Sequence, residues 1–241
     1  MVKLQKKPYF GSINNNPNSK KMKKLIFLIS VLTAFSVTAQ RFPEARYFYG
    51  IKGGVNFFNI NSDDIEFKSG TGFNAAFTRR LPLAGILEAN VYAEFQQSNF
   101  SANAVDLLSS NSSSVEVDYK LQSVKLGALL NLKAYGPYFS VLLGPVIQFN
   151  DKLKYDSEQE DYILATIVEG TDSDFVTVDD VSKISGFNFN VAAGISTGDI
   201  NYKVYGLYEY GINNIMSSIN LNTGSITGHT SLFTVGAIVY F

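Results

Sequence analysis

The sequence predicts an all-β fold, an eight-stranded antiparallel up-and-down transmembrane β-barrel. Eight segments alternate between apolar side chains on one face and polar or small side chains on the other, as strands do when they separate lipid from a polar interior. Short and long connections take turns between these segments. The last segment runs to Phe241, and we expect it to pair with the first so that no strand edge stays open.

The eight predicted strands follow one another along most of the chain. They are residues 47–58, 70–79, 85–97, 117–132, 137–149, 185–196, 201–212 and 231–241. The third has the cleanest alternation, because Leu87, Val91 and Phe95 share one face. Glu88 and Glu94 fall on the other face. This period of two is the period of side chains along a β-strand.

Each predicted strand has an apolar face without charge in its middle. In chain order these faces carry Tyr49, Ile51, Val55 and Phe57; Phe73, Ala75 and Phe77; Leu87, Ala89, Val91, Ala93 and Phe95; Val124, Leu126, Ala128, Leu130 and Leu132; Phe139, Val141, Leu143 and Ile147; Phe187, Phe189, Val191, Ala193 and Ile195; Tyr202, Val204, Tyr208 and Tyr210; and Phe233, Val235, Ala237, Val239 and Phe241. We expect these faces to contact lipid. A soluble barrel of the lipocalin type, with the apolar faces inward, is the alternative.

The first 39 residues are predicted to be removable. Residues 22–39 have the two lysines, the apolar stretch and the small residue Ala39 of a secretory signal peptide. A membrane anchor is the alternative, but it would need about 20 apolar residues. Residues 1–21 are interpreted as an upstream extension, with Met22 as the true start. Residues 40–241 then form the barrel domain.

Charge and composition exclude several classes of protein. The chain carries 20 Lys and Arg against 21 Asp and Glu, and the first 39 residues hold seven of the lysines and no acid. The remainder therefore has 13 basic and 21 acidic residues, a net charge of −8 (13 − 21), which disfavours a nucleic-acid partner. The chain has no cysteine, so a disulfide framework and a lipid-attachment cysteine are excluded. We find no motif for a cofactor and predict none.

The connections predict the orientation of the barrel. Short links lie at 80–84, 134–136 and 197–200, and long polar links lie at 59–69, 98–116, 150–184 and 213–229. Bacterial outer-membrane barrels have short periplasmic turns and long outer loops. We therefore expect both termini in the periplasm. Aromatic residues at the strand ends are expected to form the two interfacial belts, with Tyr47, Tyr135, Tyr138, Tyr202 and Phe241 in one and Phe57, Phe95, Phe149, Phe187 and Tyr210 in the other.

Charged residues at predicted interior positions are the candidate site of the sequence. They are Lys52, Glu88, Glu94, Lys125, Lys203 and Glu209, three of each sign. Eight strands enclose an interior just wide enough for side chains, and buried charges are tolerated when they are paired. We expect a paired network that fills the lumen; a proton or ion path is the alternative.

His229 and Ser231 are the best candidates for catalysis, although we predict that the chain is not an enzyme. The pair lies on the lipid-facing parity near the outer rim and is similar to a His-x-Ser pair of outer-membrane lipid A deacylases. A serine nucleophile needs a base, and that base needs an orienting acid. Glu209 on the neighbouring strand has the opposite parity, so a histidine at the headgroup level is the simpler interpretation.

The third long connection is strongly acidic. It holds Asp151, Asp156, Glu158, Glu160, Asp161, Glu169, Asp172, Asp174, Asp179 and Asp180. The spacing is not that of a dedicated calcium loop. A solvated surface loop is the first interpretation, and a contact with divalent cations or a basic partner is the alternative.

Several segments together have the form of a known family: the TAQ end of the signal, YKLQSVKLGALLNLK, GPYFSVLLGP, YKVYGLYEYGINNI and the final aromatic residue. In these segments the chain resembles the small PorT-like outer-membrane β-barrel proteins (porin family) of Bacteroidota. The resemblance implies the fold and the bacterial outer membrane, and it implies no reaction.

Three functions remain open at this point. The first is a non-enzymatic surface or envelope-assembly component whose extracellular loops bind other molecules. The second is a narrow channel or transporter, and the third is a lipid A-modifying enzyme that uses His229 and Ser231. Expected partners are outer-membrane lipid, lipopolysaccharide and other envelope proteins around a monomeric barrel.

Overall fold

The computed structural model describes residues 48–106, 114–169, 172–219, 221 and 224–241. The predicted signal peptide at 22–39, the extension at 1–21 and Tyr47 lie outside the described residues, and those predictions stay untested. Within the described ranges, no helix is long and apolar enough to cross a membrane.

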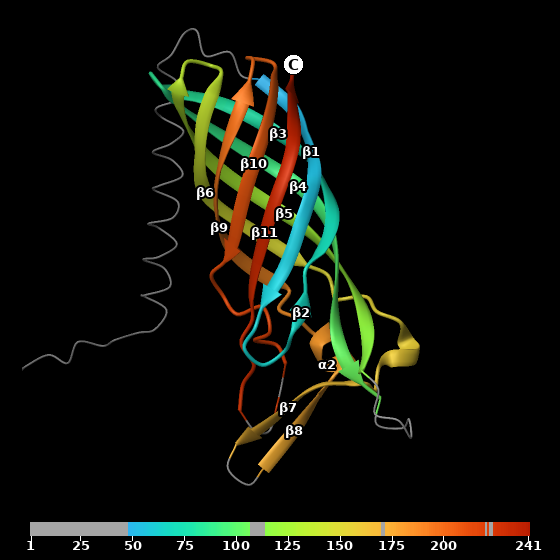
Figure 1. Cartoon of the computed structure of the whole chain (residues 1–241). Coiled ribbons are helices and arrows are strands. Elements are labelled where there is room, and N and C mark those ends of the chain that lie inside the picture. The colour runs from blue at the N-terminus through green and yellow to red at the C-terminus, as the bar shows by residue number, and fades with distance from the viewer. Residues whose placement is uncertain (1–47, 107–113, 170–171, 220, 222–223) are drawn as a thin grey trace, which may run out of the picture. The chain divides into compact units, whose positions relative to one another are not determined.

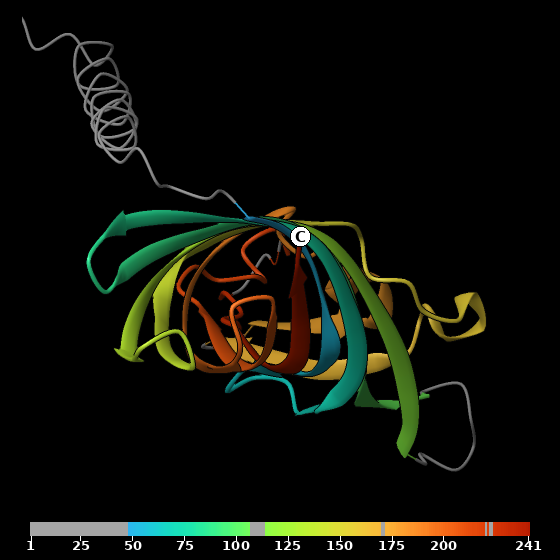
Figure 2. The same ribbon diagram turned by 90° about the horizontal axis from the view of Figure 1, so that it is seen from above.

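Eight antiparallel strands form a closed ring (Figures 1 and 2). In ring order they are β3 (Gly70–Ala84), β1 (Phe48–Asn61), β11 (His229–Tyr240), β10 (Tyr202–Gly211), β9 (Phe187–Gly198), β6 (Phe139–Asn150), β5 (Ser114–Tyr135) and β4 (Leu87–Val105). β4 pairs with β3 and closes the ring. The predicted eight-stranded fold is therefore confirmed.

The last strand pairs with the first, as the tail of the sequence predicts. Val235 faces Val55 across this pair, and Phe233 faces Phe57. The backbone amide of Phe241 donates a hydrogen bond of 2.8 Å to the carbonyl of Tyr49. The ring thus has no open edge at the junction of β1 and β11.

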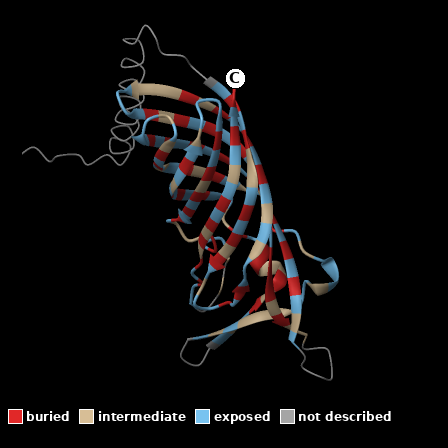
Figure 3. Ribbon diagram, turned by 45° about the horizontal axis from the view of Figure 1, so that its top comes forward, coloured by how far each residue is buried: buried red, intermediate tan, exposed pale blue. Residues whose placement is uncertain are grey.

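Burial alternates along every strand of the ring, as Figure 3 shows in red and pale blue. Phe77, Leu126 and Ile195 are among the apolar residues that point outward and are exposed. Lys52, Glu94 and many other polar residues point inward and are buried. Exposed apolar and buried polar residues are the arrangement of a barrel in lipid, so the soluble alternative is wrong.

The two ends of the barrel differ. At the short-turn end, tight turns at 85–86, 136–138 and 199–201 join the strands, and Phe241 lies there. At the long-loop end the chain forms β2 (Phe67–Lys68), a 3-10 turn η2 (Ser157–Gln159), β7 (Ile163–Glu169), β8 (Asp172–Thr177) and α2 (Val178–Ser182).

One predicted long loop is mostly strand. β4 and β5 continue their pairing past the ring to Val105 and Ser114, so the expectation of a polar loop is wrong for residues 98–105 and 114–116, while residues 107–113 lie outside the described residues. Inward side chains of this extension are apolar and buried, as at Phe100 and Ala102. The extension forms because these residues have a second apolar core to join.

The second core, which we call the loop-end core, lies at the long-loop end. Its buried residues are Phe58, Ile60, Ile65, Phe67, Phe100, Ala102, Ala104, Val117, Tyr119, Leu121, Leu153, Val176, Val178, Val181, Ile184, Ile215, Met216, Ile226 and Leu232. They come from the ends of the ring strands and from three of the long connections. The long connections are therefore packed against one another around a common apolar centre.

Candidate functional site

Four of the six predicted charged residues form two ion pairs inside the lumen. Lys52 Nζ is 2.7 Å from Glu94 Oε2, and Lys125 Nζ is 2.6 Å from Glu209 Oε2. All four side chains are at most 4% exposed. Each charge has its partner at hydrogen-bonding distance, which is the condition for tolerating a charge away from water.

The other two predicted charges lie nearer the short-turn end and do not pair with each other. Glu88 Oε1 is 2.7 Å from Lys133 Nζ, a lysine outside the predicted set. Lys203 Nζ donates a hydrogen bond to the carbonyl of Pro137. The six residues therefore lie at two levels of the lumen.

Two tyrosines and an asparagine contact the Lys52–Glu94 pair. No role was predicted for them from the sequence. The Lys52 ammonium lies 4.0 Å from the centre of the Tyr92 ring and 4.9 Å from that of Tyr205. Asn74 Nδ2 donates to Glu94 Oε2 at 2.8 Å. Such cation–π contacts are favourable when the site excludes water.

A glycine opposite an aromatic residue is the signal that could have located this contact. Tyr92 faces Gly127 across the pair of β4 and β5. A Cβ atom on Gly127 would lie 2.1 Å from Cζ of Tyr92. The ring can therefore lie across the lumen because position 127 has no side chain.

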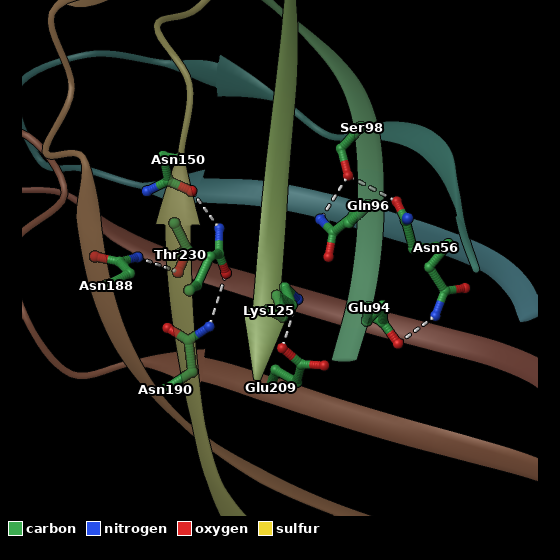
Figure 4. A network of polar contacts seen from close by, with 12 residues as sticks. Asn56, Glu94, Gln96, Ser98, Lys125, Asn150, Asn188, Asn190, Glu209 and Thr230 are labelled. Atoms are coloured by element: carbon green, nitrogen blue, oxygen red, sulfur yellow. Dashed lines mark hydrogen bonds and ion pairs between the residues drawn. The ribbon is translucent and has the colours of Figure 1, made fainter. Parts of the chain in front are cut away.

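Hydrogen-bonded amides fill the next layer toward the long-loop end (Figure 4). Ser98 Oγ donates to Asn56 Oδ1 at 2.8 Å, and Gln96 Nε2 donates to Ser98 Oγ at 2.8 Å. Across the lumen, Asn190 Nδ2 donates to Gln148 Oε1 at 2.8 Å. The first contact joins β1 to β4 across the intervening β3, and the last joins the neighbouring strands β9 and β6.

Little space is left inside the ring. One cavity of about 10 Å³ lies among Lys52, Tyr92, Tyr205 and their neighbours, which is room for about one water molecule. An apolar layer with Leu129 and Leu142 lies beside it. The described lumen is therefore packed, as expected for a ring of eight strands.

His229 and Ser231 do not form a catalytic arrangement. His229 Nδ1 lies 3.0 Å from the carbonyl oxygen of Gly211, and the imidazole stacks on Tyr210 with ring centres 5.8 Å apart. Ser231 Oγ accepts a hydrogen bond of 3.3 Å from Asn61 Nδ2. A backbone carbonyl thus occupies the nitrogen that an orienting carboxylate would hold in a triad.

The acidic connection is folded, and part of its charge is used internally. Lys183 Nζ lies 2.9 Å from Asp179 Oδ2, and Tyr155 OH donates to Asp179 Oδ1 at 3.1 Å. The hydrogen bond from Lys183 holds the pKa of Asp179 below its usual range, and burial raises the pKa of Tyr155 to about 12. In the described part of the chain, no three His, Asp or Glu side chains are grouped to hold a metal ion.

The chain belongs to the outer membrane protein beta-barrel domain family. The model of this family matches residues 38–217, which is 180 of the 241 residues. The membership agrees with the closed ring, the exposed apolar band and the polar lumen. It indicates the bacterial outer membrane as the location of the protein.

Comparison with solved structures finds similar barrels at low sequence identity. Neisserial surface protein A is 15% identical with a TM-score of 0.44, and the match covers 80% of this chain and 97% of that one. Ail, the attachment invasion locus protein of Yersinia pestis in complex with the heparin analogue sucrose octasulfate, is 16% identical with a TM-score of 0.43, covering 81% and 99%. OprG from Pseudomonas aeruginosa is 12% identical with a TM-score of 0.44, covering 82% and 97%. Comparison with curated proteins finds no match.

Proposed function

We propose that this chain is a non-enzymatic outer-membrane barrel of the PorT-like kind of Bacteroidota, and that it serves as a surface or envelope-assembly component. The observation that carries the proposal is the division of the interior into a packed lumen and a folded loop-end core. Three long connections that share buried contacts with the ends of the ring strands present a defined surface. Binding of other envelope molecules is the use that fits such a surface.

The orientation is part of the proposal. Short turns on the periplasmic side and long loops outside are the habit of bacterial outer-membrane barrels. With that orientation both termini lie in the periplasm and the loop-end core lies at the cell surface. Lipid and lipopolysaccharide then surround a monomeric barrel, and other envelope proteins meet its long connections.

The proposal is tested by isolating the barrel from its native envelope. An affinity tag is inserted after Gly224, an exposed glycine of the long-loop end, and the envelope is extracted in mild detergent. A partner protein recovered in a fixed ratio supports the proposal. A barrel that is recovered alone, or with lipid only, contradicts the assembly role.

The channel and the enzyme make different predictions. A lumen blocked by paired charges and tyrosine rings is expected to give no ion conductance when the purified barrel is inserted into planar bilayers, and stable conductance would favour the channel. Replacing Ser231 with Ala is expected to leave the acyl pattern of lipid A unchanged. A changed pattern would favour the lipid A-modifying enzyme.

A further inference from the structure

The hairpin of β7 and β8 extends from the ring at the long-loop end (Figure 1). β7 joins the large sheet through a single residue pair, Val105 with Ile163. β8 pairs with β7 and is the last strand in the order of the sheet. Its second edge therefore has no strand partner among the described residues. An edge of this kind offers backbone amides and carbonyls to an added strand.

Two large apolar side chains are exposed on one face of this hairpin. Thr166 faces Phe175 and Val168 faces Ser173 across the pair, so Phe175 and Val168 share a face. Phe175 is 55% exposed and Val168 is 68% exposed. They lie outside the apolar band of the ring, so contact with lipid does not account for their exposure.

The charge around the hairpin points to a cationic partner. Residues 150–184 contain ten Asp and Glu against three Lys, a net charge of −7 (3 − 10). β8 itself, DSDFVT, contains neither Lys nor Pro, two of the residues that protect an edge from strand addition, and its only charged residues are two Asp. A second copy of this chain would bring one acidic segment against another. Like charges disfavour that pairing, and an approaching cationic segment is attracted.

We propose that the free edge of β8 binds an extended segment of another envelope protein by strand addition. The segment alternates basic and apolar residues. Its apolar side chains extend the face of Phe175 and Val168, and its basic side chains are attracted by the net negative charge of residues 150–184. Backbone hydrogen bonds supply affinity, and the alternating side chains supply selectivity. The inference rests on the proposed function in one respect, because it needs the long-loop end to meet other proteins.

The test uses the full barrel in nanodiscs of zwitterionic lipid and a fluorescent, capped hexapeptide of alternating Lys and Val. Anisotropy measures binding, and nanodiscs without the barrel supply the blank. Phe175→Thr is expected to weaken binding by about fivefold or more. A capped hexapeptide of alternating Glu and Val is expected not to bind, because the acidic connection repels it. Glu158→Gln is the matched control, because it removes one charge of the same connection away from the hairpin. It is expected to change binding by less than about twofold.

A Lys–Val peptide with N-methylated backbone amides keeps the charge and the side chains but cannot add as a strand. It is expected not to bind. Equal binding of the N-methylated and unmodified Lys–Val peptides, or equal binding to the wild type and Phe175→Thr, would overturn the inference. If the Lys–Val peptide fails while the native envelope still yields a stoichiometric partner, the strand-addition site is wrong and the proposed function stands. If both fail, both are wrong.

Discussion

The lumen of the ring and the loop-end core are two interiors of one barrel with opposite chemistry. The lumen is filled with paired charges and amides, such as Lys125 with Glu209, whereas the loop-end core is filled with apolar side chains such as Leu121 and Val117. Both interiors are enclosed in part by the same strands, β4 and β5. The difference teaches that the medium outside the strand, and not the strand itself, decides which face is apolar.

The change of medium can be followed along β5. Odd-numbered residues point inward from Val115 to Lys133. Between 124 and 132 the outward side chains are apolar, as at Leu126, but at Glu116, Asp118 and Lys120 they are charged and exposed. The exchange falls near Gln122, which faces Gln97 on β4. We infer that one surface of the membrane crosses β4 and β5 at this level.

The largest expected effect comes from breaking a lumen pair. Lys125→Met leaves the Glu209 carboxylate buried without its 2.6 Å partner, and removing one member of such a pair costs about 3 to 5 kcal/mol. Equilibrium unfolding in urea, in detergent micelles, measures the loss. The double variant Lys125→Met with Glu209→Leu is expected to recover most of it, because no unpaired charge remains. A double variant as unstable as the single one would contradict the paired lumen.

The loop-end core gives the next effect. Leu121→Ala removes a fully buried side chain and is expected to lower the free energy of unfolding by about 2 to 5 kcal/mol. The matched control is Leu130→Ala on the same strand, since Leu130 is 48% exposed on the outward face. Its truncation leaves no cavity and loses only the transfer of the removed carbons from water to lipid, so it should cost about 1 to 2 kcal/mol. Equal costs at both positions would show that the loop-end core is not a packed interior.

Substitution by arginine should affect stability differently at outward positions on the two sides of Gln122. Leu126→Arg places a charge in the lipid-facing band and is expected to cost about 2 to 4 kcal/mol. Asp118→Arg, which is also outward but beyond the inferred boundary, should change stability by about 0.5 kcal/mol or less. The same urea titration in lipid bilayers measures both. Similar losses of stability for the two variants would contradict a membrane boundary near Gln122.

The smallest effect is expected at the exposed ion pair of the acidic connection. Asp179→Asn removes the 2.9 Å contact with Lys183, and solvent screening limits the loss to about 0.5 kcal/mol. Because the pKa of Asp179 is lowered in the folded chain, the stabilisation is present above the unfolded pKa of about 4 and is lost as pH falls through the folded value. The wild type and the variant should therefore differ at neutral pH and converge in acid. A difference that grows below pH of about 4 would contradict this.

Much of the ring could be predicted from the sequence, because the alternation in strands such as 85–97 records which face meets lipid. The loop-end core could not be predicted in the same way. Its inward residues Ala102 and Ala104 are small, and they lie among serines and asparagines that resemble a loop. Ala102 and Ala104 also point inward, whereas Phe95 points outward on the same strand. A search for one continuous lipid-facing face of apolar residues therefore misses them.

The candidate site was predicted by residue type and parity but not by partner. Parity places Glu88 and Lys203 inside the ring, yet the depth of a side chain depends on the stagger between strands. That stagger brings Lys133 to Glu88 and turns Lys203 toward the carbonyl of Pro137. The pairing of acids with bases therefore depends on how the strands are staggered in the closed barrel, and the sequence of one strand does not determine it.

One measurement tests the change of medium along β5 most directly. Because the chain contains no cysteine, a single nitroxide label can be attached in turn at Glu116, Asp118, Lys120, Val124 and Leu126. Collision with oxygen reports lipid, and collision with a water-soluble nickel chelate reports water. We expect oxygen to dominate at Val124 and Leu126, and nickel to dominate at the three charged positions. If labels at Lys120 and Asp118 meet oxygen as often as the label at Leu126, the membrane extends past Gln122 and the division into two interiors by their surrounding medium is wrong.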